Sequence, residues 1–445
     1  MFDERAADDD PERPTKVRAM AIAPMSGFPP PPQAVVTLGN WQQPPFNRWA
    51  FQHLRELIPT QRIARGPRKK PLPRLKNPPV LEDLAVARLG AGVPSVGGVL
   101  ADTWTDAVIV LHEGQIVLER YFGRMQANTP HLLMSVSKSI VGCVSGILVG
   151  QGRLDPEAPV TRYVPEFAGS GYDGATVRNL LDMRTGVAFS EAYENPDAQV
   201  RVIERHMGWH PLDDSGRIGM YAYLTSLAAE GPHGGPFVYR SADTDVLGWV
   251  CERAAGVRMA DLVSHLIWAP MGTEFDAEIT CDPVGSAVHD GGISAAGRDL
   301  ARFGMLLLDD GWVGNRAVVP AEWLQQARHI DADIRAAFAS CDSEPILPGG
   351  WYRNQFWFVP GPSGDMQLCL GIHGQMVFVD RGTRTVAVKL SSWPTPQDPA
   401  YLVDTIRAFS AVGRHLAGLG PVDDAATVKP SGPTGIVEGS ERGHA

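Results

Sequence analysis

Two kinds of apolar pattern alternate along the chain, and each predicts a different element. Short β-branched runs flank a glycine-containing turn at 112–115, which predicts a β-hairpin over residues 107–121. Toward the other end of the chain, three more such runs are joined by short turns, which favours antiparallel pairing between them. These predicted strands span residues 366–372, 376–380 and 385–391.

The second pattern consists of apolar residues at helical spacing. It begins at Val136 and continues through Val149, which predicts an amphipathic helix. Residues 150–280 are rich in turns and mostly helical by pattern. The further predicted helices span residues 177–183, 220–229, 243–255, 298–308 and 401–416.

The two ends of the chain show neither pattern. Residues 1–38 are charged and then proline-rich, so we expect disorder or loose wrapping there. Residues 421–445 form a polar tail of Gly, Pro and Ser, which we also expect to be disordered. Between these ends, the aromatic residues of 41–58 offer enough apolar surface to dock on a core, and 59–80 is a predicted connector. The folded domain is therefore expected over 39–420.

Length and charge narrow the classes of protein. At 445 residues the chain exceeds the usual size of a single core, so two lobes or a large insertion are expected. The formal net charge of -10 argues against binding to nucleic acid or to anionic membranes. The one basic cluster, at 62–76, is interrupted by prolines and glycines, which favours a solvated linker. No run of about 18 apolar residues occurs, so no membrane span is expected.

Cysteine usage bears on the cellular compartment and on metal binding. The five cysteines are odd in number, far apart and without C-x-x-C spacing, which argues against a disulfide framework or a zinc site. The N-terminus is acidic and lacks the apolar region of a signal peptide. We expect a cytoplasmic protein that uses neither a metal nor a cofactor.

The strongest candidate chemistry lies at the start of the helix predicted from Val136. The chain has only seven lysines, and Lys138 is the only one with a serine, Ser135, three residues before it. Positions i and i+3 share a helix face, so the hydroxyl and the amine would point into one space. A lysine in an apolar site loses proton affinity, as a base must. Ser137 and Ser139 have no lysine three residues later, which leaves Ser135 as the candidate nucleophile.

Two other segments offer complementary groups. Tyr239 follows a glycine-rich turn and could shuttle protons beside Lys138, although an ordinary core tyrosine is the alternative. The small residues of 371–375 interrupt a predicted strand, and an edge strand there could donate an N–H to a substrate carbonyl; the alternative is a simple β-bulge. The glycine pattern at 169–174 formally matches a dinucleotide-binding motif, but no strand precedes it, so we predict a plain turn.

Together these motifs carry a family resemblance. S-V-S-K, then Y-x-S, then G-G-I-S with a following D-L-A-R-F, resembles the serine β-lactamase and penicillin-recognising superfamily in its class C and esterase branch. Longer segments resemble the 6-aminohexanoate-dimer hydrolases, which cleave nylon oligomers, and the resemblance covers roughly residues 40–415. These segments are 41–51, 131–139, 241–247, 371–375 and 388–394. The α/β-hydrolase motif G-x-S-x-G, the zinc motif H-E-x-x-H and Walker A are absent from the sequence.

The resemblance implies a fold of the α/β (α+β) class, an antiparallel sheet flanked by helices with an inserted, mostly helical lobe. The sheet-containing lobe would comprise residues 39–134 and 280–420, and the helical lobe residues 135–279. Pockets often form where lobes meet, which would place Ser135 at the floor of a cleft.

The resemblance also implies catalytic roles. Ser135 would be the nucleophile, Lys138 its base, and Tyr239 the proton shuttle and leaving-group acid. The backbone N–H groups of Ser135 and Ile372 would form the oxyanion hole.

Further residues are implied as substrate contacts. Tyr193 matches a tyrosine that contacts the scissile amide nitrogen, Trp357 matches an aromatic lid, and Glu204 matches a carboxylate that helps to hold a substrate ammonium. Each of these three has a role in packing or at the surface as its alternative.

The sequence also departs from the family patterns. Ser241 stands where β-lactamases have the Asn of Y-x-N, and His373-Gly374-Gln375 replaces K-T-G. A side chain that would grip a β-lactam carboxylate is thus missing, which argues against antibiotic hydrolysis. Asp290 stands where the amide hydrolases tend to have Asn or His, which changes a substrate contact and weakens the case for nylon dimers.

Three functional hypotheses follow. The first is a serine hydrolase that cleaves amide or ester bonds of small linear substrates through an acyl-serine intermediate. The second is a carboxylesterase with little amidase activity, and the third is a non-catalytic binder on the same fold. The expected partner is a small-molecule amide or ester. A homodimer is one alternative for the oligomeric state.

Overall fold

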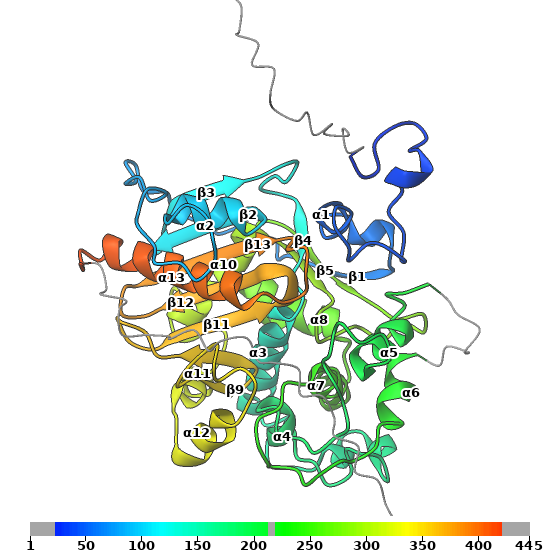
Figure 1. Ribbon diagram of the computed structural model, residues 1–445. Helices are drawn as coiled ribbons and strands as arrows, with labels where there is room; N and C mark the ends of the chain where they lie inside the picture. Colours follow the sequence, from blue (N-terminus) through cyan, green and yellow to red (C-terminus); the bar gives the residue numbers. More distant parts are fainter. Residues whose placement is uncertain (1–22, 212–218, 421–445) are drawn as a thin grey trace, which may run out of the picture.

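A seven-stranded antiparallel sheet organises the molecule (Figure 1). The computed structural model describes residues 23–211 and 219–420. The strand order is β3-β2-β13-β12-β11-β10-β9, so the first hairpin pairs with strands from the far end of the chain. The strands are β2 (Thr105–His112), β3 (Gln115–Tyr121), β9 (Trp351–Arg353), β10 (Phe356–Val359), β11 (Met366–Gly371), β12 (Gln375–Asp380) and β13 (Thr385–Ser391). The hairpin and the three C-terminal strands expected from the apolar runs are confirmed.

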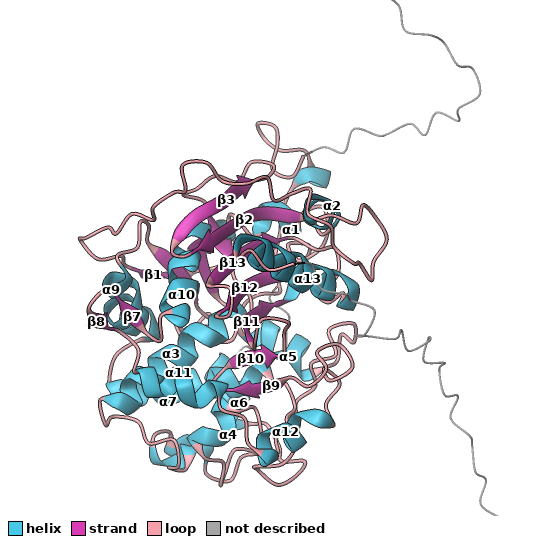
Figure 2. Cartoon of the chain, turned by 90° about the vertical axis from the view of Figure 1, so that its left-hand side faces the viewer, coloured by secondary structure: helices cyan, strands magenta, loops and turns pink. Residues whose placement is uncertain are grey.

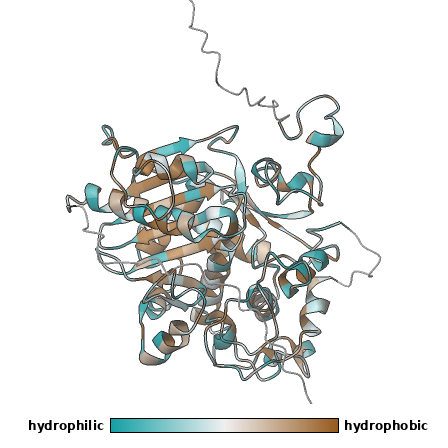
Figure 3. Ribbon diagram, in the orientation of Figure 1, coloured by the Kyte–Doolittle hydropathy of each residue, from teal (hydrophilic) through white to brown (hydrophobic). Residues whose placement is uncertain are grey.

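Helices cover both faces of this sheet (Figure 2). Val108 and Val110 of β2 pack on the side of α2 (Val96–Asp102) and α13 (Pro399–Leu416). Ile109 and Leu111, one position along, pack on the side of α3 (Val136–Gly150) and α10 (Gly297–Leu308). Successive strand residues face opposite sides, so a run that is apolar throughout is buried on both faces. Figure 3 accordingly shows the strands coloured mostly as hydrophobic.

A second, four-stranded sheet lies beside α3 and has the order β1-β5-β6-β4. Its strands are β1 (Thr60–Ile63), β5 (Ala277–Thr280), β6 (Ile293–Ala296) and β4 (Pro130–Leu132). The expected connector at 59–80 therefore contains a strand, because Thr60 pairs with Thr280 far along the chain. A small hairpin, β7 (Trp312–Val313) with β8 (Arg316–Ala317), completes the strands of the described residues.

Most of the remaining helices gather on the side of α3 away from the seven-stranded sheet (Figure 1). They are α4 (Val177–Leu181), α5 (Gln199–His206), α6 (Met220–Thr225), α7 (Ser241–Ala255) and α8 (Met259–Val263). The short helix α9 (Ala269–Met271) lies beside α10. Two more, α11 (Ala321–Arg328) and α12 (Ala332–Ala339), precede β9. The glycine pattern at 169–174 lies in turns, as expected. The division of the chain into two lobes stays a prediction.

The N-terminal arm is more ordered than its composition suggests. Residues 23–38 are described, and Val36 is buried in the larger hydrophobic core, whereas the side chain of Phe28 is fully exposed. Trp41 is also buried, so the segment that contains α1 (Asn47–Ala50) docks on the core as expected. The rest of the expected N-terminal disorder, residues 1–22, and the tail 421–445 lie outside the described residues. None of the helices in 23–211 and 219–420 is long and apolar enough to cross a membrane.

Candidate active site

Ser135 is placed at the start of α3 by a sharp turn. Met134, just before it, has a φ of 48°, a left-handed conformation that a non-glycine residue adopts only when its surroundings enforce it. Leu133 is held to β6, since its N–H donates to Ile293 O at 2.8 Å. The turn lets β4 run directly into the helix. Ser135 is thereby presented at the helix N-terminus, where backbone N–H groups favour negative charge.

Lys138 is the centre of the polar contacts around Ser135. Its Nζ lies 2.8 Å from Ser135 Oγ, 3.1 Å from Ser241 Oγ and 2.8 Å from the carbonyl oxygen of Asp290. These three acceptors use all three hydrogens of an ammonium. The structure therefore brings the expected nucleophile and its lysine partner into direct contact, together with Ser241 and Asp290.

The electrostatics of Lys138 differ from the expectation that burial would lower its proton affinity. Burial does act to lower the pKa of Lys138, but electrostatic interactions with its acidic neighbours raise the pKa above its ordinary value. The neighbours are the oxygen of Tyr239 and the carboxylates of Asp290, Glu191 and Asp245. Asp290 Oδ2 lies 3.5 Å from Nζ. The resting side chain is thus an ammonium, and its proton affinity is raised, whereas the expectation from the sequence is a lowered one.

Tyr239 lies over the same ammonium. Lys138 Nζ is 5.2 Å from the centre of the Tyr239 ring. Burial raises the pKa of Tyr239, although the charge of Lys138 and the hydroxyl of Ser135 oppose that rise. Trp357, in β10, stacks on the Tyr239 ring with centroids 5.3 Å apart and is only 9% exposed. In this structure Trp357 is thus a strand residue that supports Tyr239, and its contact with a substrate as a lid stays a prediction.

Glu191 is a site residue that sequence reasoning missed. Its carboxylate accepts a hydrogen bond from the Tyr193 hydroxyl at 2.7 Å and another from the backbone N–H of Ser241. Burial raises the pKa of Glu191, and the charge of Lys138 opposes the rise. Glu191 therefore connects Tyr193 to the Ser135–Lys138 pair. The segment has no periodicity, and the only available signal was an acid two residues before Tyr193.

A second buried acid stands behind Asp290. Asp245 Oδ1, on α7, accepts hydrogen bonds from the N–H groups of His289 (2.9 Å) and Asp290 (3.1 Å). Burial and the nearby charge of Asp290 raise the pKa of Asp245 well above its ordinary value. Asp290 Oδ1 is buried and has no hydrogen-bond partner among the described residues. The charge of Asp290 thus raises the pKa values of both Lys138 and Asp245.

The end of β11 lies against the segment that carries Ser135. A Cβ on Gly371 would come within 2.6 Å of Leu133 O and 3.1 Å of Met134 Cβ, so only glycine allows this approach. Ile372 follows at the start of a short turn, η6 (Ile372–Gly374). β11 pairs with β10 only over Met366–Leu368, so its end at Gly371 pairs with Gln375 of β12 and with no residue of β10. The donation of an N–H from this end of the strand to a substrate carbonyl stays a prediction.

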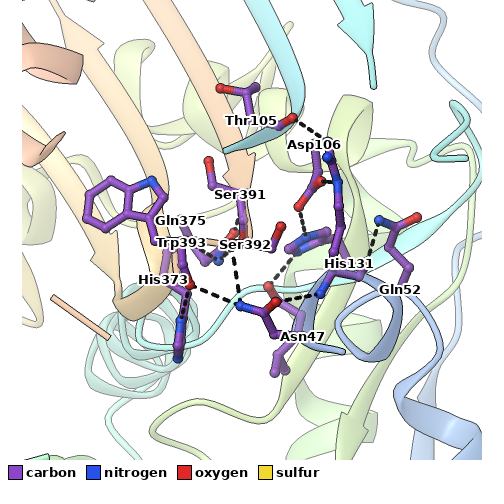
Figure 4. Close-up of polar contacts among 12 residues, drawn as sticks. Asn47, Gln52, Thr105, Asp106, His131, His373, Gln375, Ser391, Ser392 and Trp393 are labelled. Atoms are coloured by element: carbon purple, nitrogen blue, oxygen red, sulfur yellow. Dashed lines mark hydrogen bonds and ion pairs between the residues drawn. The ribbon is translucent and has the colours of Figure 1, made fainter. Parts of the chain in front are cut away.

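His373 and Glu204 do not join the groups around Lys138. His373 Nδ1 lies 2.8 Å from Trp393 O, and burial lowers the pKa of His373 to about 4, so the ring is neutral (Figure 4). Burial would raise the pKa of Glu204, but hydrogen bonds from His210 and Arg201 lower it below its ordinary value. Arg201 Nη1 and His210 Nε2 lie 2.8 Å and 3.0 Å from Glu204 Oε2. This pairing favours the packing alternative for Glu204.

A cavity of about 580 Å³ opens beside the site. Tyr193 and His373 form part of its wall, which connects the cavity to the contacts described above. Other lining residues are Trp41, Gln42, Arg201, Arg205 and His210. Within 23–211 and 219–420, no group of three or more His, Cys, Asp or Glu side chains is arranged to hold a metal ion. The cavity has room for a small organic molecule, and Ser135 itself is not among its lining residues.

Comparisons with known proteins agree with this geometry. The family described as Beta-lactamase matches residues 100–410. The chain is 38% identical over 383 residues to the 6-aminohexanoate-dimer hydrolase of Paenarthrobacter ureafaciens, which covers 84% of this chain and 95% of that protein. It is 31% identical over 196 residues to the esterase EstB of Burkholderia gladioli, which covers 41% of this chain and 48% of that esterase.

A solved structure extends the likeness to three dimensions. A Bacillus anthracis protein assigned as a 6-aminohexanoate-dimer hydrolase matches with a TM-score of 0.78 at 28% identity. The match covers 86% of this chain and 98% of that one. The resemblance and the fold class expected from the motifs are therefore confirmed.

Proposed function

The chain belongs to the beta-lactamase family of hydrolases, and from that membership we propose that it cleaves amide or ester bonds of small linear substrates through an acyl-serine intermediate. The observation that carries the proposal is the 2.8 Å contact between Lys138 Nζ and Ser135 Oγ at the start of a helix. Acyl transfer by serine needs a group that accepts the hydroxyl proton, donors for the oxyanion and an acid for the leaving group.

The Lys138–Tyr239 pair serves as the proton acceptor after it has lost one proton. Both pKa values are raised, so the resting pair holds an ammonium and a phenol. In the reactive form, Ser135 Oγ attacks the substrate carbonyl carbon and its proton moves to the pair. Tyr239 then gives that proton to the departing nitrogen or oxygen. In the second half of the reaction, a water oxygen attacks the acyl carbon and gives a proton to the pair. The bond to Ser135 Oγ then breaks, the proton returns to Oγ, and the acid is released.

The negative oxygen formed by the attack is held by two backbone N–H groups. One belongs to Ser135 itself, whose N–H has no acceptor among the described residues. The other belongs to Ile372, which follows the close approach of Gly371 to Leu133. Such donors stabilise charge that develops only in the transition state.

Tyr193 favours an amide over an ester. Its hydroxyl hydrogen is donated to Glu191, so the hydroxyl oxygen has a lone pair left to accept a hydrogen bond. A scissile amide N–H can donate to that lone pair, and an ester has no such hydrogen. This contact supports amidase activity.

A carboxylesterase with little amidase activity is the second candidate. The observation that favours it is the 31% identity to the esterase EstB. The same Ser135, Lys138 and Tyr239 would carry that reaction, since an ester leaving group needs less help from a proton donor. A catalytically silent binder is disfavoured by the contacts that join these three residues.

A hydrolysis panel tests the proposal. Short-chain p-nitrophenyl esters, 6-aminohexanoate dimer and nitrocefin are offered to the wild type and to Ser135→Ala. We expect turnover of esters and linear amides that Ser135→Ala abolishes, and little turnover of nitrocefin. Equal rates for the two proteins on every substrate would refute the proposal.

A further inference from the structure

The backbone pairing between β12 and β13 stops early, and a side chain replaces it. The outermost pair is Met376 with Lys389, because the chain just before β12 forms the turn η6 and does not continue the strand. Ser391, the next residue of β13 that faces this side, is fully buried. Gln375 Oε1 accepts from Ser391 N–H at 3.0 Å, and Gln375 Nε2 donates to Ser391 O at 2.7 Å. A side-chain amide thus takes the place of the missing peptide group and avoids the cost of unpaired buried groups.

The same amide also reaches the turn. Gln375 Nε2 lies 3.2 Å from His373 O and 3.4 Å from Ile372 O, so its hydrogens are shared between β13 and η6. The outer side of the turn is held as well, because His373 N–H donates to Pro396 O and Trp393 N–H donates to His373 O. Figure 4 shows Gln375 beside Ser391, with His373 and Trp393 next to them. The turn is therefore fixed by Gln375 on one side and by residues 393–396 on the other.

These contacts lie on either side of the peptide group that joins Gly371 to Ile372. On its N-terminal side, Gly371 is fixed by its fit against Leu133 O and Met134. On its C-terminal side, the carbonyl of Ile372 is fixed by Gln375. The N–H between these two points is the proposed second oxyanion donor. A small rotation of this peptide would move the N–H away from Ser135.

We propose that Gln375 is a positioning residue that holds the N–H of Ile372 in the oxyanion hole by replacing the broken strand pairing and tying η6 to β13. This inference rests on the proposed acyl-serine mechanism. Gln375 touches neither substrate nor reacting atoms, so its effect belongs to the transition state. Loss of one oxyanion donor costs on the order of 10²-fold in kcat, and a misplaced donor costs part of that.

Two variants separate the link of Gln375 to the turn η6 from its link to strand β13. Gln375→Met removes the amide at similar volume and so removes both links. Gln375→Glu, protonated in its buried position, keeps an acceptor for Ser391 N–H and one O–H for Ser391 O, but gives up the donor to the η6 carbonyls. Gln367→Met is the matched control, because Gln367 is also buried, lies on neighbouring β11, and has an Oε1 without a partner in the described part of the chain.

The readouts are kcat, KM, the affinity for a boronic acid that forms a tetrahedral adduct with Ser135, and the melting temperature. For both Gln375 variants we expect kcat and boronic acid affinity to fall by about 10- to 100-fold, with KM within about threefold of the wild type. Gln367→Met should leave kcat, KM and boronic acid affinity close to wild type.

The outcomes distinguish this inference from the function on which it rests. If both Gln375 variants match Gln367→Met in kcat and boronic acid affinity, Gln375 does not position the oxyanion hole. If Gln375→Met fails to fold, Gln375→Glu decides in the same way, because it keeps the link to Ser391. If the wild type itself is no more active than Ser135→Ala, the proposed function fails and the role of Gln375 fails with it, whereas an active wild type with equally active Gln375 variants overturns the role of Gln375 alone.

Discussion

The hydroxyl of Tyr193 donates to Glu191 at 2.7 Å, and this one contact decides what Tyr193 can offer a substrate. The hydroxyl hydrogen is already used, so only an oxygen lone pair faces the site. Glu191 in turn accepts from the N–H of Ser241, next to Lys138. The proposed preference for amides would thus be linked to Lys138 through one carboxylate.

Tyr193→Phe should therefore lower amide hydrolysis far more than ester hydrolysis. We expect kcat/KM for a linear amide to fall by at least about 10-fold, while that for a p-nitrophenyl ester stays within about threefold. Parallel assays with the two substrates measure this ratio. Equal losses on both substrates would show that Tyr193 does not contact the scissile amide.

The pH dependence should reflect the charged neighbours of Lys138. The reactive form of the Lys138–Tyr239 pair has lost one proton, and both pKa values are raised, so kcat/KM should rise with pH through the neutral range. Asp290→Asn removes a negative charge that raises the pKa of Lys138, so the rise should shift to lower pH. Asp365→Asn, at an exposed aspartate, is the control. An unchanged pH profile for Asp290→Asn would contradict this assignment.

Gly371→Ala should disable the oxyanion hole. The added methyl would meet Leu133 O at 2.6 Å, so the end of β11 must move away from the segment before Ser135. We expect kcat to fall by roughly 100-fold or more. Gly231→Ala, where an added Cβ meets nothing within 4 Å, should keep its activity. Wild-type kcat in Gly371→Ala would show that this approach is not needed.

The second buried lysine should affect stability and not catalysis. Lys389 donates to Thr103 O at 3.0 Å, and burial lowers the pKa of Lys389 to about 7, although Asp106 opposes this. Between pH 7 and the ordinary lysine pKa, the unfolded chain binds a proton that the folded protein lacks, so stability from this group rises with pH. Urea unfolding at pH 7 and pH 9.5 should show that the wild type gains stability relative to Lys389→Met as pH rises. A constant difference would contradict the lowered pKa.

Local patterns predicted those parts of the fold whose contacts are local. The hairpin of β2 and β3 has a glycine turn in which Glu113 and Gly114 both have positive φ, a turn chemistry visible in the sequence. The helix after Ser135 has its own periodicity. Strand β1, by contrast, forms because Thr60 pairs with Thr280, and no local sequence pattern predicts that pairing.

The candidate site divides in the same way. Ser135 and Lys138 are three residues apart, so helix geometry alone predicted their contact, which is 2.8 Å long. The proton affinity of Lys138 could not be predicted, because Glu191, Asp245 and Asp290 come from three separate segments that only the fold brings together. The extent of the free strand edge near Ile372 could not be predicted either, because β10 comes from an earlier part of the chain and pairs with β11 only over Met366–Leu368.

The most direct test of the account is covalent labelling of Ser135. The folded protein is incubated with a fluorophosphonate probe, and the labelled residue is located by peptide mass spectrometry, with Ser135→Ala as the control. The account predicts one stoichiometric label on Ser135 and none on the variant. No label on Ser135 of the folded wild type, or the same labelling of both proteins, would contradict the acyl-serine mechanism.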